Sequence, residues 1–123
     1  MASQQKELQD LTDEFATLQT ELQSVVEARQ KLESQQQENI GVQAEFDKIA
    51  DDANVYKLVG PVLLKQDKSE AVMAVKGRLE FIEKEIKRIE DQINEIQEKS
   101  EKKKMDVIAL QTTMQQQAQA AAS

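Results

Sequence analysis

The feature that most constrains this chain is a heptad repeat in its second half. Apolar residues recur there at alternating spacings of three and four, which places them at the a and d positions of about six heptads. They are Val72, Val75, Leu79, Ile82, Ile86, Ile89, Ile93 and Ile96, and the same register resumes at Val107, Leu110 and Met114. A stripe this narrow must pack on another helix, so the pattern predicts a coiled-coil helix over about residues 68–117.

A matching stripe in the first half predicts a second helix, over about residues 4–53. It consists of Leu8, Leu11, Phe15, Leu18, Leu22, Val25 and Leu32. The stripe also holds the polar residues Arg29, Gln36 and Asn39. We expect its phase to slip by about one residue between Gln35 and Val42 before Phe46 and Ile49 resume it. Because the two helices are nearly equal in length and their connector is short, we expect them to fold back into a long antiparallel two-helix coiled coil.

The connector, residues 55–66, predicts a β-hairpin. Gly60-Pro61 separates two β-rich runs, and glycine adopts the positive φ that the first central position of such a turn requires. Val59 would then lie opposite Val62, and Leu58 opposite Leu63. We expect Asn54 to close the first helix in a left-handed conformation, and Asp67 to open the second as its N-cap.

Both faces of this hairpin would be apolar, which favours a role in subunit assembly. A lone two-stranded hairpin is marginal in water, and its edges carry unpaired backbone groups. The alternative, a hairpin folded onto its own helices, would hide one face and leave the edges open. Met73 and Phe81 add apolar surface at outward heptad positions nearby. The expected assembly residues are Val55, Tyr56, Leu58, Val59, Val62, Leu63, Leu64, Met73 and Phe81.

Several function classes are disfavoured by what the sequence lacks. A net charge of −7 argues against nucleic acid as a partner. No run approaches the roughly 18 apolar residues that span a bilayer, and no signal peptide opens the chain, so we expect a cytoplasmic protein without membrane contact. With no His, no Cys and no glycine-rich loop, we expect no catalytic residues, no metal site and no cofactor.

The segment Val55–Gln66, flanked by two long heptad helices, resembles the β-class subunits of prefoldin. The segments Ala28–Glu33, Glu38-Asn39 and Glu85–Arg88 are similar to one type of β-class subunit in particular. The resemblance covers nearly the whole chain. A single hairpin fits the β class rather than the α class.

The resemblance implies an ATP-independent cochaperone built as a hexamer of α-class and β-class subunits. Its hairpins would join in an intersubunit β-barrel. Its coiled-coil tips would hold unfolded clients, such as actin and tubulin chains, and pass them to the cytosolic chaperonin. Residues 1–123 would then form a single prefoldin-like unit with a flexible tail over residues 118–123.

Near the chain ends, polar residues interrupt the stripe and suggest how a tip could open. Ser100 and Lys103 occupy an a and a d position, where we expect them to lie near Leu22 and Leu18. They forfeit apolar burial and could form a weak joint, or they could simply fix the register. Beyond the joint, Met105 adds flexible apolar surface. The expected client-binding residues of the tip are Leu8, Leu11, Phe15, Val107, Ile108, Leu110 and Met114.

One alternative function remains open from the sequence. A structural or scaffolding coiled coil without client-holding activity would use the middle segment as a plain loop. It would form a discrete homodimer and ignore an α-class partner.

Overall fold

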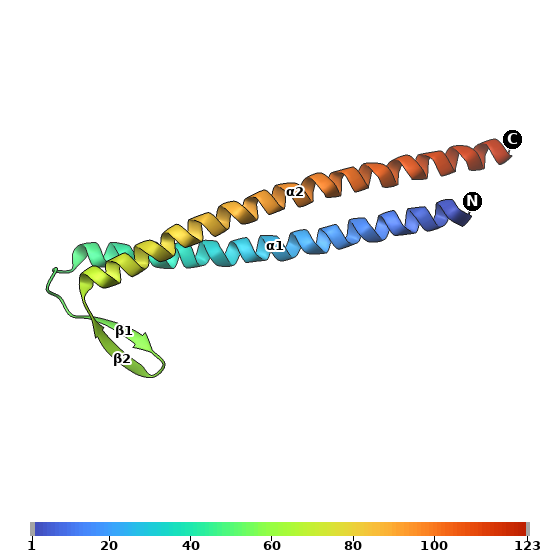
Figure 1. Cartoon of the computed structure of the whole chain (residues 1–123). Helices are drawn as coiled ribbons and strands as arrows, with labels where there is room; N and C mark the ends of the chain where they lie inside the picture. The colour runs from blue at the N-terminus through green and yellow to red at the C-terminus, as the bar shows by residue number, and fades with distance from the viewer. Residues whose placement is uncertain (1, 123) are drawn as a thin grey trace. The chain divides into compact units, whose positions relative to one another are not determined.

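A computed structural model describes residues 2–122 and contains two long helices joined by a β-hairpin (Figure 1). The elements in chain order are α1 (Ala2–Lys48), β1 (Val55–Val59), β2 (Val62–Gln66) and α2 (Lys68–Ala122). The described residues fall into two compact units. The terminal unit comprises residues 2–28 and 89–122, and the hairpin unit comprises residues 29–88. In both, α1 and α2 run antiparallel, as the heptads predict.

In the hairpin unit, β1 and β2 pair in the predicted register. Val59 lies opposite Val62, Leu58 opposite Leu63 and Tyr56 opposite Lys65. Gly60 has a φ of 59°, the positive value that glycine adopts without steric cost, and Pro61 completes the two-residue turn. The turn chemistry therefore sets which side chains share each face of the hairpin.

The core of the hairpin unit lies along α2. Val75, Ile82 and Ile86 are buried there at heptad positions, and Ala71 is buried beside the half-buried heptad residue Val72. The facing stripe of α1 is half-buried and continues at spacings of three and four without interruption, through Leu32, Gln36, Asn39, Gln43 and Phe46. The predicted phase slip is therefore wrong. Polar residues occupy the regular positions of α1, and the apolar Ile40 and Val42 are exposed beside them.

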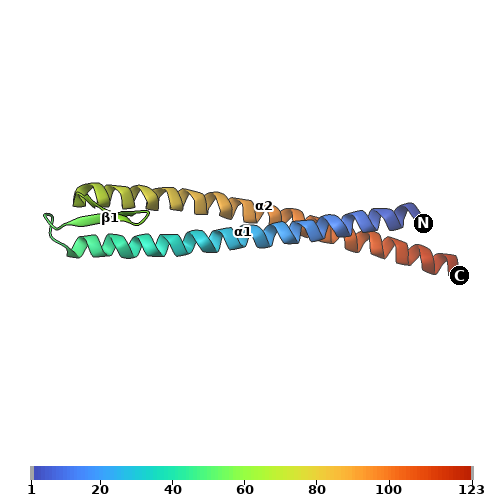
Figure 2. The ribbon, with the colours of Figure 1, turned by 90° about the horizontal axis from the view of Figure 1, so that it is seen from below.

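In the terminal unit, the two helices pack along the same kind of stripe. Ile89, Ile96 and Ser100 are buried on α2, while the facing apolar residues of α1 are half-buried. The N- and C-terminal ends lie at the same end of this unit in both views (Figures 1 and 2). This antiparallel arrangement brings residues from the two ends of the chain together.

The first helix ends earlier than predicted, at Lys48 rather than at residue 53. Lys68, at the start of α2, donates a hydrogen bond from Nζ to the Ile49 carbonyl oxygen at 2.9 Å and pairs with Asp51 Oδ1 at 3.0 Å. This lysine therefore satisfies a carbonyl at the helix end that would otherwise lack a partner. Asn54 does not have the left-handed conformation expected of it. Among residues 2–122, Gly60 alone has a positive φ.

The second helix continues further than predicted, through Ala122 rather than to residue 117. Residues 118–122, expected to be a flexible tail, are helical. Alanine and glutamine are favourable helix residues, so low complexity in this segment does not prevent helix formation. Ser123 lies outside the described residues.

Candidate functional site

Both faces of the hairpin are exposed in the single chain. Leu58 and Leu63 face each other across the strands and are 68% and 63% exposed. The opposite face carries Val59, Val62 and Leu64, which are also exposed, while Val55 is half-buried. The described helices therefore cover neither face, contrary to the alternative in which the hairpin folds onto them.

The hairpin also has two open edges. β1 and β2 form a two-stranded sheet, so each strand pairs on one side only. Unpaired strand edges with apolar faces favour pairing with another chain. The hairpin thus has both properties that an intersubunit sheet requires.

Met73 and Phe81 lie on α2 and are 68% and 64% exposed, and Met73 lines a groove together with Lys65 and Gln66 of the hairpin. Exposed large apolar side chains are common when scattered, but these two stand on the same helix within the same unit as the hairpin. The exposed Ile40 and Val42 of α1 were missed by the sequence reasoning, because the supposed phase slip assigned no face to them.

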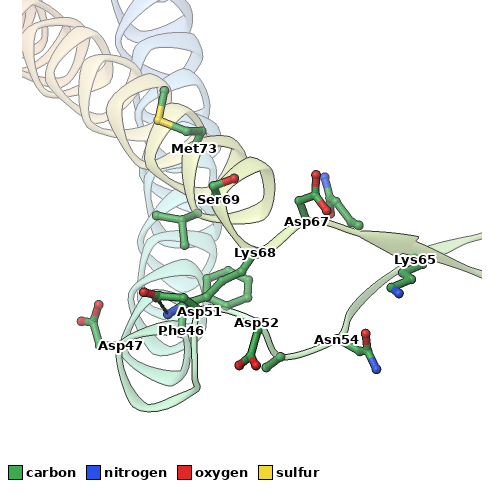
Figure 3. Close-up of a pocket in the computed structure, with 13 residues that line it drawn as sticks. Phe46, Asp47, Asp51, Asp52, Asn54, Lys65, Asp67, Lys68, Ser69 and Met73 are labelled. Atoms are coloured by element: carbon green, nitrogen blue, oxygen red, sulfur yellow. Dashed lines mark hydrogen bonds and ion pairs between the residues drawn. The ribbon is translucent and has the colours of Figure 1, made fainter.

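A groove opens where the helix ends meet the hairpin (Figure 3). We call it the end groove. Its apolar lining is Phe46, Val72 and Met73, and its carboxylates are Asp47, Asp51, Asp52 and Asp67. Lys68 and Asp51 pair over the Phe46 ring, whereas Asp47 and Asp52 point outward. Lys65 of the hairpin also lines the groove, so carboxylates outnumber lysines there.

In the terminal unit, the predicted tip residues are gathered on facing stripes. Half-buried positions on α1 include Leu8, Leu11 and Phe15, and those on α2 include Val107, Leu110 and Met114. Ile108 is exposed, as is Met105. The closed tip therefore presents part of its apolar surface and keeps the remainder between the helices.

The two polar positions in this stripe have partners across the helix pair. Gln19 donates a hydrogen bond from Nε2 to the Ser100 hydroxyl, and Lys103 forms an ion pair with Glu14. The hydrogen bond that Lys103 donates to the Glu14 carboxylate raises the pKa of Lys103 above its usual value, and this effect exceeds the opposing effect of desolvation. Leu22 lines the same groove as Ser100, and Leu18 the same groove as Lys103, as predicted. The bonds themselves are made by residues about one turn nearer the N-terminus.

Pairing of these polar groups satisfies them in the closed form. Buried Ser100 has its hydrogen bond, and Lys103 keeps its charge in contact with an opposite charge. Separating the helices at these two layers costs less free energy than exposing apolar side chains would. Water can replace the lost hydrogen bond and ion pair once the helices part. The polar layers can therefore fix the register and still separate more easily than a Leu or Ile layer.

Two further kinds of site, a metal site and a membrane span, concern residues 2–122. No three Asp, Glu, His or Cys side chains in this range come together as a metal site. No helix within it combines the length and apolar character needed to cross a membrane.

Comparisons with known proteins agree on one family. A family profile described as Prefoldin subunit matches residues 9–119. Prefoldin subunit 6 of Saccharomyces cerevisiae is 47% identical over 106 residues, covering 86% of this chain and 93% of the relative. Prefoldin subunit 6 of Homo sapiens is 40% identical over 117 residues, covering 95% and 90%.

A solved structure has the same fold. The prefoldin beta subunit from Thermococcus strain KS-1 superimposes with a TM-score of 0.77 at 28% identity, covering 84% of this chain and 90% of that one.

Proposed function

The chain belongs to the prefoldin family, and on that premise we propose that it works as a β-class subunit of a hexameric, ATP-independent cochaperone. In this proposal it assembles with α-class and other β-class subunits through its hairpin. Its terminal unit holds unfolded proteins, such as actin and tubulin chains, for delivery to the cytosolic chaperonin. The observation that carries the proposal is the hairpin, whose two apolar faces and two strand edges are all open in the single chain.

Assembly is favoured by the hairpin's chemistry. An isolated two-stranded hairpin is marginally stable, and each large apolar side chain buried on association contributes about 1.5–3 kcal/mol. The proposed assembly residues are the hairpin set named above together with Met73 and Phe81. A subunit without partners would leave these side chains in water.

Client holding is assigned to the terminal unit because its apolar surface is adaptable. Met105 and Ile108 are exposed beside the half-buried tip residues. Methionine has three rotatable bonds and a polarizable sulfur, which suits a surface that must fit many partners.

The first test removes the exposed apolar side chains of the tip. Met105→Ser with Ile108→Ser should raise, on the order of two- to threefold, the concentration of assembled complex that prevents aggregation of diluted, denatured actin. The effect is limited because the other subunits keep their own arms. Light scattering without ATP measures it.

Its matched control is Ile40→Ser with Val42→Ser, which removes similar exposed side chains from the hairpin unit. This control should suppress aggregation as well as the unchanged chain does. An equal rise, in both variants, in the concentration of complex needed to prevent aggregation would contradict the assignment of client holding to the tip. A chain that stays a discrete homodimer in the presence of an α-class subunit would instead favour the scaffold function.

The second test closes the polar layers. Ser100→Ile with Lys103→Leu fills the stripe, so we expect about 2 kcal/mol more stability of the helix pair by thermal unfolding. If the tip must separate to hold a client, the same variant should suppress aggregation less well.

The control places the same side chains on exposed surface, as Ser24→Ile with Lys102→Leu. These positions lie on α1 and α2 of the terminal unit but outside the stripe. If the Ser100→Ile, Lys103→Leu chain is more stable and still holds clients as well as the unchanged chain does, separation of the helices is not needed.

A further inference from the structure

An exposed ridge on α2 has no role in the fold of this chain. Met73, Gly77 and Phe81 follow one another at intervals of four residues, so they lie along one face of the helix. Met73 and Phe81 are largely exposed, and Gly77 between them is exposed as well. We call these three residues the α2 ridge. It consists of two large apolar side chains with a notch between them.

The notch is not required by the chain itself. A Cβ built on Gly77 would meet no atom within 4 Å, and its φ is not positive. Glycine is among the least favourable residues in a helix interior. Neither backbone conformation nor packing within the chain therefore accounts for it, whereas close approach of another backbone would.

The α2 ridge continues into the end groove, because Met73 belongs to both. The groove adds carboxylates at this end, and Asp47 and Asp52 point outward from it. Farther along, the flanks of the ridge carry charges of both signs, including Glu80, Lys76 and Lys84. A ligand of the whole surface should thus be apolar along its length and basic at one end.

The hairpin of this chain has that chemistry. The segment Val55–Gln66 carries Lys57 and Lys65 among its apolar residues and has no acidic residue. Its strands of five residues are about 17 Å long, and the ridge from Met73 to Phe81 is about 12 Å long. A strand is therefore long enough to cover the ridge and reach the groove.

We propose that the α2 ridge and the end groove receive the β-hairpin of the neighbouring prefoldin subunit, a hairpin with apolar side chains and lysines like the one in this chain. One strand would approach the helix at Gly77, and a lysine would lie near Asp47 and Asp52. This chain would then contribute its own hairpin to the assembly and receive the hairpin of a neighbour on its α2 ridge. This inference rests on the proposed assembly function and names the surface that receives the hairpin.

The test fills the notch. Gly77→Gln should preserve the helix content and raise the thermal midpoint of the isolated chain, because glutamine favours helix. In the reconstituted complex it should raise the dissociation constant about tenfold, since a side chain would occupy the space of the neighbour's strand. Native mass spectrometry over a dilution series measures the dissociation.

Gly41→Gln is the matched control. Gly41 is also an exposed helical glycine with no atom within 4 Å of a Cβ, but its neighbours four residues away are Gln37 and Glu45. It should stabilise the chain equally and leave the complex unchanged. Equal dissociation constants for both variants would overturn the inference while leaving the proposed assembly intact.

A photoreactive phenylalanine at position 81 identifies the occupant. A cross-link to a hairpin peptide of a neighbouring subunit supports the inference. A cross-link to a neighbour's helices, or only to an added unfolded client, overturns it. If the unchanged chain forms no complex with other prefoldin subunits, the proposed assembly function itself is wrong. This outcome differs from an intact complex with an unexpected cross-link, which contradicts only the inference about the α2 ridge.

Discussion

Replacing Leu58 and Leu63 by aspartate should abolish incorporation of this chain into a prefoldin complex while leaving its helices folded. The two leucines form a cross-strand pair on one exposed face of the hairpin. Burying two leucines contributes about 3–6 kcal/mol, so their loss alone raises the dissociation constant at least about a hundredfold. The new carboxylates add the cost of burying charge without a partner. Size-exclusion chromatography with light scattering measures incorporation, and circular dichroism measures helix content.

Aspartate also disfavours strands, so a second variant separates loss of contact from loss of the hairpin. Leu58→Thr with Leu63→Thr keeps a high β-propensity and removes apolar surface. It should weaken incorporation strongly as well. Gln30→Asp with Gln37→Asp adds the same two charges on exposed positions of α1 and should assemble normally. Normal incorporation of the Leu58→Asp, Leu63→Asp chain would remove the basis of the proposed function.

The second large effect concerns the helix pair of the hairpin unit. Ile82 is 5% exposed and belongs to the α2 stripe, whereas Ile40 of α1 is 43% exposed. Truncating a buried isoleucine to alanine costs about 2–5 kcal/mol through lost transfer energy and the cavity left behind. We expect Ile82→Ala to lower the free energy of unfolding by about 2–3 kcal/mol, because the pair is only two helices thick.

Ile40→Ala is its control within the same unit. The same atoms are removed from an exposed site, and alanine has the better helix propensity, so the change should stay within about 0.5 kcal/mol. Urea denaturation followed by circular dichroism measures both variants. Similar losses in the two would mean that Ile40 packs between the helices as Ile82 does, contrary to its exposure in the structure.

The sequence predicted an element correctly where the local pattern of residues was strong. The α2 stripe is almost wholly apolar from Val72 to Ile96, so its period could be assigned without ambiguity. The hairpin register could be assigned because Gly60-Pro61 allows a two-residue turn at one place. Alternation along the strands then determined the two faces.

The errors arose where a residue far along the chain decides the outcome. The α1 stripe continues through Gln36, Asn39 and Gln43 without a slip, but these polar side chains give little apolar signal from which its phase could be read. The end of α1 depends on Lys68, which reaches back from α2 to the Ile49 carbonyl.

Tyr56 gives the hairpin an intrinsic optical label. It is the single tyrosine of a chain without tryptophan, and it stands exposed on β1. Ultraviolet fluorescence of this protein in isolation therefore originates mainly from one phenol on the surface assigned to assembly. Self-association that covers the hairpin should alter this emission, whereas events confined to the far ends of the helices should leave it unchanged.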